Sequence, residues 1–287
     1  MGSVYLAFVV FLFVLAVFDL MVGVSNDAVN FLQSANGAKV ATIRTILTVA
    51  AVGIFFGATM SNGMMDVARN GVFHPSMFSF QDVMFIYLAV MASDIVLLDI
   101  FNTLGLPTST TVSMVFELLG GTVAIALIKT FGDSAINAGE LMNTSKALTM
   151  IMAIFVSVAI AFAVGTFVQY ISRLIFTFTY NNKALKWKIG IFGGIAFTAI
   201  VYFMLIKGVG NFSFMTADAK AWMNTHQWTI CGICFVTFAI LSQILYFLKI
   251  SVFKVLVLAG TFALAMAFAG NDLVNFIGVP LAGFASY

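Results

Sequence analysis

The sequence predicts an all-α membrane protein, a polytopic helical bundle, and three observations carry that prediction. Of the 287 residues, 62% are hydrophobic and only 8% are charged, whereas about a quarter of a soluble domain is charged. Apolar runs close to the length of a bilayer span recur through the whole chain. The phrase Asn-Asp-x-Val-Asn-Phe occurs twice, at 26–31 (the first phrase) and 271–276 (the second phrase). This repetition predicts an internal repeat with a polar site between its halves.

The apolar runs give the expected membrane spans in order along the chain. They lie at about 4–22, 44–60, 82–104, 112–128, 147–172, 189–207, 229–248 and 252–269. We expect a single transmembrane domain over 1–287. Its expected parts are a first repeat at about 1–172, a basic connection at 173–188, additional spans at 189–248 and the start of a second repeat at 252–287.

The direction of the spans follows from the basic residues in their connections. With the segment 173–188 in the cytoplasm, eight of the thirteen Lys and Arg residues fall inside and five outside, which is the bias expected of an inner (cytoplasmic) cell membrane. The first and last spans then run in opposite directions. This is the arrangement of inverted repeats, of which the second is incomplete here.

The first phrase follows Gly23-Val24-Ser25, a small and polar stretch at the end of an apolar run. Such a stretch favours a broken or re-entrant helix where it lines a cavity or is buried in protein. We therefore expect a break at 23–27 and a half-helix at 28–38.

Each phrase combines one carboxylate with side-chain amides at membrane depth. An intramembrane aspartate is costly and therefore indicates a functional site, although an interhelical hydrogen bond is the alternative. Carboxylate, amide and backbone oxygens suit an alkali cation. The residues of this expected sodium site are Asn26, Asp27, Asn30, Asn271, Asp272 and Asn275.

Four hydroxyl residues in a row, Thr108 to Thr111, follow Pro107. If the backbone after the proline is not helical, their hydroxyls and freed N–H groups form a cradle for an oxyanion. Because no permanent positive charge is present, co-bound cations would have to neutralise the anion, which is a physical basis for symport. The alternative is that these hydroxyls bond to their own helix.

The remaining polar residues carry less information. Asp19, Asp94, Asp99 and Glu117 are either site residues or partners in interhelical hydrogen bonds, and the sequence leaves both open. Cys231 and Cys234 are expected to be buried packing residues. No cofactor or enzymatic constellation is predicted, and a net charge of +2 without a basic cluster does not indicate nucleic acid.

Three stretches resemble the inorganic phosphate transporter (PiT) family. Residues 22–30 and 269–275 are similar to its two Gly-Ala-Asn-Asp-type signatures, and 106–113 is similar to its Pro-x-Ser-Thr-Thr-His-Ser loop. The resemblance implies inverted repeats that carry phosphate by alternating access, with sodium ions or protons. It implies phosphate contacts at Asn26, Asp27, Thr108, Ser109, Thr110, Thr111 and Asp272. It implies cation contacts at Asn26, Asn30, Asn271 and Asn275.

The sequence departs from the family pattern at three places. Val112 replaces the usual His, Glu117 stands where small residues are typical, and no second Pro-x-Ser-Thr-Thr loop follows Asp272. The last departure implies either a fragment, or a homo-oligomer or further chain that supplies the other half. A sulfate or other oxyanion permease and a truncated, non-transporting membrane subunit remain alternatives to a phosphate symporter.

Overall fold

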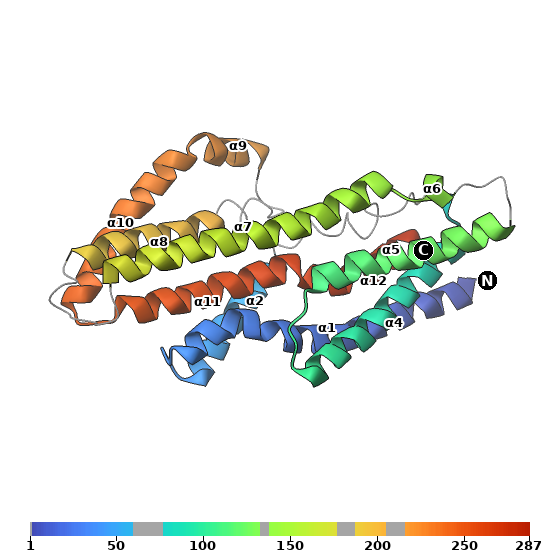
Figure 1. Cartoon of the computed structure of the whole chain (residues 1–287), viewed down its shortest axis with the longest axis horizontal. Coiled ribbons are helices and arrows are strands. Elements are labelled where there is room, and N and C mark those ends of the chain that lie inside the picture. The colour runs from blue at the N-terminus through green and yellow to red at the C-terminus, as the bar shows by residue number, and fades with distance from the viewer. Residues whose placement is uncertain (1, 60–76, 133–137, 177–186, 205–215) are drawn as a thin grey trace. The chain divides into compact units, whose positions relative to one another are not determined.

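The computed structural model describes residues 2–59, 77–132, 138–176, 187–204 and 216–287 of the chain. Helices dominate these residues (Figure 1). They are α1 (Gly2–Gly37), α2 (Ile43–Thr59), α4 (Phe80–Leu104), α5 (Thr110–Gly132), α6 (Ala138–Leu141), α7 (Thr144–Phe176), α8 (Lys188–Tyr202), α9 (Ala217–Thr225), α10 (Gln227–Phe247), α11 (Val252–Asn271) and α12 (Leu273–Ser286).

Within the described residues, six stretches are helical, long and apolar enough to cross a bilayer, and α2 and α8 are shorter apolar helices. The predicted all-α, multi-pass membrane fold is thus confirmed. The span expected at 44–60 is α2, the span expected at 82–104 is α4, and the span expected at 229–248 is α10. These spans could be predicted because polar residues flank each apolar run.

The chain divides into two compact units. Unit 1 takes residues from 1–30, 61–156 and 271–287, and unit 2 takes residues from 31–60 and 157–270. Each unit is described below by itself. The expected single domain and its repeat boundaries stay predictions.

Unit 1 is built around α4, which packs against both α5 and α12. Its apolar core holds fully buried side chains from several helices, and Leu12, Met84, Tyr87, Leu118 and Val279 are among them. Between membrane helices such side chains stabilise the unit through close packing, because lipid is as apolar as they are. The core holds the polar side chains of the same helices in fixed places.

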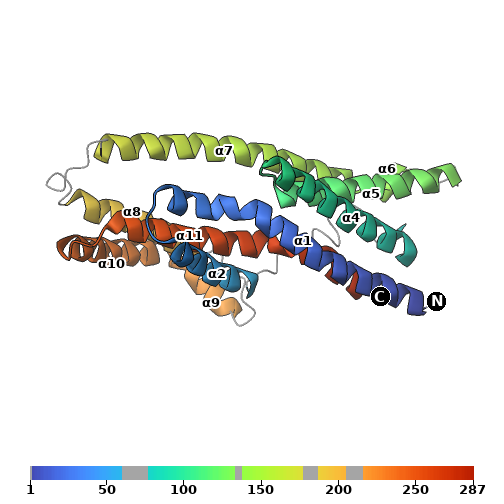
Figure 2. The ribbon, with the colours of Figure 1, turned by 90° about the horizontal axis from the view of Figure 1, so that it is seen from below.

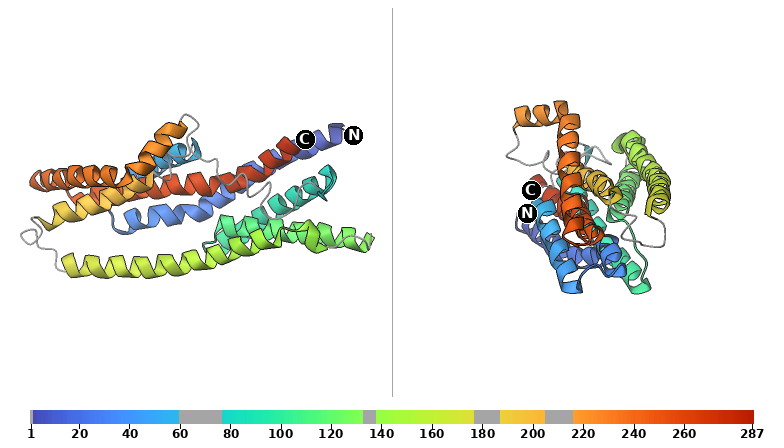
Figure 3. Two further views of the ribbon diagram at one scale, coloured as in Figure 1. Left: turned by 90° about the horizontal axis from the view of Figure 1, so that it is seen from above. Right: turned by 90° about the vertical axis from the view of Figure 1, so that its left-hand side faces the viewer.

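The part of α1 in unit 1 runs antiparallel to α12. Phe13 contacts Phe284 with ring centroids 6.4 Å apart, and further along α1 a Cβ at Gly23 would lie 2.1 Å from the ring of Phe276. Both chain ends accordingly lie at the same end of this unit (Figure 3). Within this unit, α1 and the helix of the second phrase therefore run in opposite directions; the expected span 252–269 belongs to unit 2, and its direction relative to the first span stays a prediction.

The expected break in the first phrase is wrong. Helix α1 continues from Gly2 to Gly37 without interruption, so the residues of the expected half-helix 28–38 are simply the end of α1. The physical reason is that Asn26 and Asp27 bond through their side chains to other groups, so they do not compete for the helix backbone. Local helix propensity is a weak signal that such tertiary contacts override.

The second phrase, in contrast, does interrupt a helix. Helix α11 ends at Asn271 and α12 begins at Leu273. The backbone N–H of Asn275 donates to the backbone carbonyl of Asp272 at 3.0 Å. The hydroxyl run has the expected non-helical backbone only at Thr108 and Ser109, because Thr110 and Thr111 already belong to α5. Helix α4 ends at Gly105 in the left-handed conformation (φ 68°), residues 106–109 are not helical, and α5 begins at Thr110.

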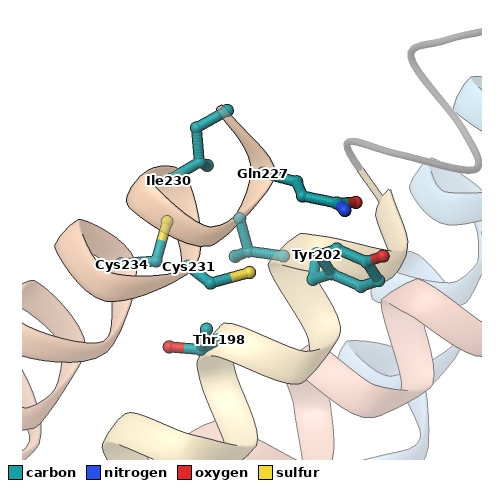
Figure 4. Close-up of a pocket in the computed structure, with 7 residues that line it drawn as sticks. Thr198, Tyr202, Gln227, Ile230, Cys231 and Cys234 are labelled. Carbon is teal, nitrogen blue, oxygen red and sulfur yellow. The ribbon is translucent and has the colours of Figure 1, made fainter. Parts of the chain in front are cut away.

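Unit 2 holds α8, α10 and α11 together (Figure 2). Glycines allow the close approach of α8 to α10: a Cβ at Gly193 would overlap the side chain of Ser242. Cys231 and Cys234 lie on α10 beside Thr198 and Tyr202 of α8, where they line a small pocket (Figure 4). Both cysteines are free and only partly buried, so the expectation of full burial is wrong.

Candidate functional site

The first phrase holds the hydroxyl loop through Asn26. The side-chain oxygen of Asn26 accepts a hydrogen bond from the amide of Thr108 at 2.9 Å. Its side-chain nitrogen donates to the carbonyl of Leu106 at 3.1 Å. Asn26 is 6% exposed, so these bonds are shielded from water and are costly to break. A single amide thus fixes both sides of Pro107.

Asn102 completes this connection, and sequence reasoning missed it. Its side-chain oxygen accepts from Asn26 at 3.0 Å, and its nitrogen donates to the carbonyl of Val22 at 2.9 Å. One signal was available: Asn102 is the last amide on α4 before the loop, eight positions after Asp94 and so close to the same helix face.

The second phrase holds the same loop region through Thr111. The hydroxyl of Thr111 donates to Asp272 Oδ1 at 2.8 Å and accepts from the side-chain nitrogen of Asn275 at 3.0 Å. Thr110 lies beside both Asp27 and Asp272. Its hydroxyl is buried beside these two carboxylates but is not aligned in a hydrogen bond with either. Such a group calls for a ligand or water.

The two aspartates face one another across this region. Asp27 is 3% exposed, its Oδ1 accepts from Asn30 at 3.3 Å, and its Oδ2 has no protein partner. Asp272 is the charged group that acts most strongly on Asp27. The two copies of the phrase, 245 positions apart, therefore contribute to one polar site in unit 1.

Some predicted residues lie at its margin. Ser109 is exposed, and its hydroxyl accepts from the amide of Val112 at 3.4 Å, as an N-cap residue does. Asn30 is also exposed. The side chain of Asn271 falls outside the described part of the structure. The residues that the fold brings together are Asn26, Asp27, Thr108, Thr110, Thr111, Asp272 and Asn275.

The arrangement presents both donors and acceptors. Hydroxyls and the first amides of α5 are donors for an anion, and a helix N-terminus favours negative charge. Asp27 Oδ2 and Asn275 Oδ1 are buried oxygens without a protein partner, which suit a cation with oxygen ligands. No group of three or more His, Cys, Asp and Glu within the described ranges is arranged to hold a metal ion. A cation here would therefore need the amide and hydroxyl oxygens as well.

Comparisons with known proteins agree with this architecture. A search of curated proteins found no match. A solved structure entitled "The sodium-dependent phosphate transporter" is similar with a TM-score of 0.69 and 16% sequence identity, over 97% of this chain and 68% of that chain. That similarity shows a shared fold. The model of the phosphate transporter family matches residues 23–287, a range that includes both phrases and the hydroxyl run. The chain is a member of the phosphate transporter family.

Proposed function

We propose that the chain carries inorganic phosphate across the cell (inner) membrane together with sodium ions or protons, by alternating access. One observation carries the proposal: the region of the hydroxyl run is tied to the first phrase by the Thr108–Asn26 bond and to the second by the Thr111–Asp272 bond. Two helices of opposite direction thus meet at one set of hydroxyls, which is the place where inverted-repeat transporters bind their substrate.

Phosphate would be held by the hydroxyls and amides around the start of α5. The hydroxyls of Thr108, Ser109, Thr110 and Thr111 supply donors, together with the side-chain amide of Asn26. Because the Thr111 hydroxyl already donates to Asp272, and both amide hydrogens of Asn26 go to Leu106 and Asn102, these two side chains would exchange a bond to reach phosphate. Asp27 and Asp272 supply acceptors for the proton of hydrogen phosphate. Sulfate has no proton near neutral pH, so a bound sulfate would leave these carboxylates repelled and unpaired. The site chemistry therefore favours phosphate over sulfate.

The carboxylates also require a positive partner when the anion binds. Two aspartates beside a phosphate anion in a low-dielectric interior repel one another strongly. We infer that cations bind next to phosphate, at Asn26, Asn30, Asn271 and Asn275 with the two aspartates. The sodium dependence named for the similar structure supports sodium as this cation, and a proton is the other candidate.

Uptake into proteoliposomes tests the proposal. Purified chain should accumulate labelled phosphate, unlabelled phosphate should compete, and sulfate should compete poorly. Replacing sodium with choline should stop uptake if sodium is the coupling ion, and collapsing the proton gradient should stop it if the proton is. Uptake that needs neither gradient would contradict symport.

The same assay addresses the rival roles. A non-transporting subunit would show no uptake by this chain alone, whereas the proposal expects uptake. Assembly with a second copy, or with a chain that supplies a further hydroxyl loop, stays a prediction. An enzyme is the least supported reading, because the family and the similar fold are those of transporters.

A further inference from the structure

Three acidic side chains of unit 1 lie outside the phosphate site; Asp19 and Asp94 are buried, and Glu117 is partly buried. Asp19 of α1 is 1% exposed and Asp94 of α4 is 4% exposed. No protein donor bonds to either carboxyl oxygen of Asp19, to either of Glu117 on α5 or to one oxygen of Asp94. Because an unpaired buried carboxylate is costly, each of these oxygens calls for an explanation.

The three carboxyl groups are neighbours. Asp19 and Asp94 lie close enough to share a hydrogen bond. Glu117 is within electrostatic range of both. Helix periodicity explains the convergence: Asp19 lies eight positions before Asp27 on α1, and Glu117 lies seven after Thr110 on α5. The cluster therefore lies about two turns from the phosphate site along both helices.

The charges that act on the cluster are negative. In the described part of unit 1, the ionisable groups facing one another here are Asp19 on α1, Asp94 on α4 and Glu117 on α5. Asp94 is in turn within range of Asp27, and Asp27 within range of Asp272 next to α12. The lysine of α5, Lys129, lies twelve positions beyond Glu117, and its ammonium pairs with Asp82 at 2.8 Å.

An ionised carboxylate only accepts hydrogen bonds. The adjacent Asp19 and Asp94 can therefore bond to one another only when one of them holds a proton. A metal ion is the alternative ligand for such oxygens. However, two carboxyl groups that share a hydrogen bond hold a proton between them, which a metal ion would displace. The contact between the two aspartates thus points to a proton.

We propose that Asp19, Asp94 and Glu117 form a proton-binding site, separate from the phosphate site, whose proton occupancy is linked to phosphate binding at Asp27. The inference rests on the proposed function, because it takes phosphate as the ligand of the first phrase. It adds a proton site whose residues lie outside both phrases and the hydroxyl run.

Electrostatics provides the link. Phosphate adds negative charge beside Asp27, and Asp94 is within range of that place. The added charge raises the proton affinity of the cluster, so a proton moves from bulk water to a carboxylate of the cluster when phosphate binds. By reciprocity, protonation of the cluster strengthens phosphate binding by the same factor. Release of phosphate returns the proton to water.

Calorimetry of phosphate binding tests the link. Purified full-length chain is titrated with phosphate in two buffers of different ionisation enthalpy, which gives the number of protons taken up per phosphate bound. We expect Asp19→Asn and Glu117→Gln to lose part of the proton uptake of the wild type. Asp99→Asn should match the wild type, because Asp99 is an exposed aspartate on the same helix as Asp94. Proton exchange by phosphate itself is common to all variants and cancels.

The outcomes separate the two proposals. No phosphate binding by the wild type would contradict the proposed function. Normal binding with the same proton uptake in Asp19→Asn, Glu117→Gln and wild type would overturn the proton site alone. Loss of sodium dependence in Glu117→Gln, with unchanged proton uptake, would assign the cluster to sodium and also overturn it. If a variant does not fold, infrared spectra of the wild type with and without phosphate test the inference. The carbonyl band of protonated carboxylic acids should change when phosphate binds, and an unchanged band would contradict the inference.

Discussion

The hydroxyl of Thr111 donates a 2.8 Å hydrogen bond to Asp272 Oδ1, although the two residues are 161 positions apart in the sequence. The same hydroxyl accepts from Asn275. One side chain on the first turn of α5 is therefore bound to both polar residues that flank the start of α12. With Asn26 on the other side of the loop, this contact makes a single site out of two distant copies of one phrase.

Removal of the Thr111 hydroxyl tests this contact. Thr111→Val keeps the shape of the side chain but leaves Asp272 and the buried Asn275 without their partner, so we expect the free energy of unfolding to fall by about 1–3 kcal/mol. Phosphate uptake should fall as well, whereas Thr111→Ser should retain both properties. Thr48→Val is the matched control, because the Thr48 hydroxyl is exposed and bonds only to its own helix. Equal stability of Thr111→Val and wild type would show that the bond is not formed.

Asn26 is expected to act on substrate affinity through the loop. Asn26→Ala removes three hydrogen bonds to the loop and to Asn102, so the loop loses its fixed position. The phosphate concentration for half-maximal uptake should rise about tenfold or more, as a loss of 1.4 kcal/mol or more implies. Asn36→Ala, at the exposed end of α1, should change it little. An unaltered half-maximal concentration in Asn26→Ala would contradict the claim that the position of the loop sets the affinity for phosphate.

Asn102 is expected to act through Asn26. Because each amide is held by the other, Asn102→Ala should weaken phosphate uptake in the same direction as Asn26→Ala. The loss of phosphate uptake in the double variant, as a free energy, should be smaller than the sum of the losses in the two single variants. A full double-mutant cycle on uptake kinetics measures this coupling. Strict additivity would mean that the 3.0 Å bond between the two side chains does not position the loop.

Gly23 is expected to be required for the packing of α1 on α12. A Cβ at this position would lie 2.1 Å from Phe276 Cζ, whose side chain is fully buried. Gly23→Ala should therefore lower the free energy of unfolding by about 1–3 kcal/mol, and the added change Phe276→Leu should restore part of it. Gly165→Ala is the control, since a Cβ there meets nothing within 4 Å. Thermal unfolding in detergent compares the four proteins, and a Gly23→Ala variant as stable as Gly165→Ala would refute the close approach.

The sequence was sufficient for the spans and insufficient for the course of the backbone. The spans 44–60 and 82–104 could be predicted because polar residues flank the apolar run at both ends. The break at Gly23 to Asp27 could not be judged, because it depends on whether Asn26 finds bonding partners about eighty positions away. In the second phrase a helix does end, between α11 and α12 at Asp272.

The buried acids show the same limit. Asp19, Asp94 and Glu117 each read as an isolated polar residue in an apolar run, and nothing in their spacing says that three different helices bring them together. Asn102 was missed for a related reason, since its role is to bond to Asn26 and Val22 of another helix. The composition of a span indicates that a polar group must be paired. Only the tertiary packing shows with what.

The account rests on the claim that both copies of the phrase belong to one phosphate site. Phosphate uptake by reconstituted Asp27→Asn and Asp272→Asn, measured beside the wild type, tests it most directly. Asp218→Asn serves as control, because Asp218 is exposed at the start of α9. The account predicts background uptake in both site variants and wild-type uptake in the control. Wild-type uptake by either Asp27→Asn or Asp272→Asn would contradict it.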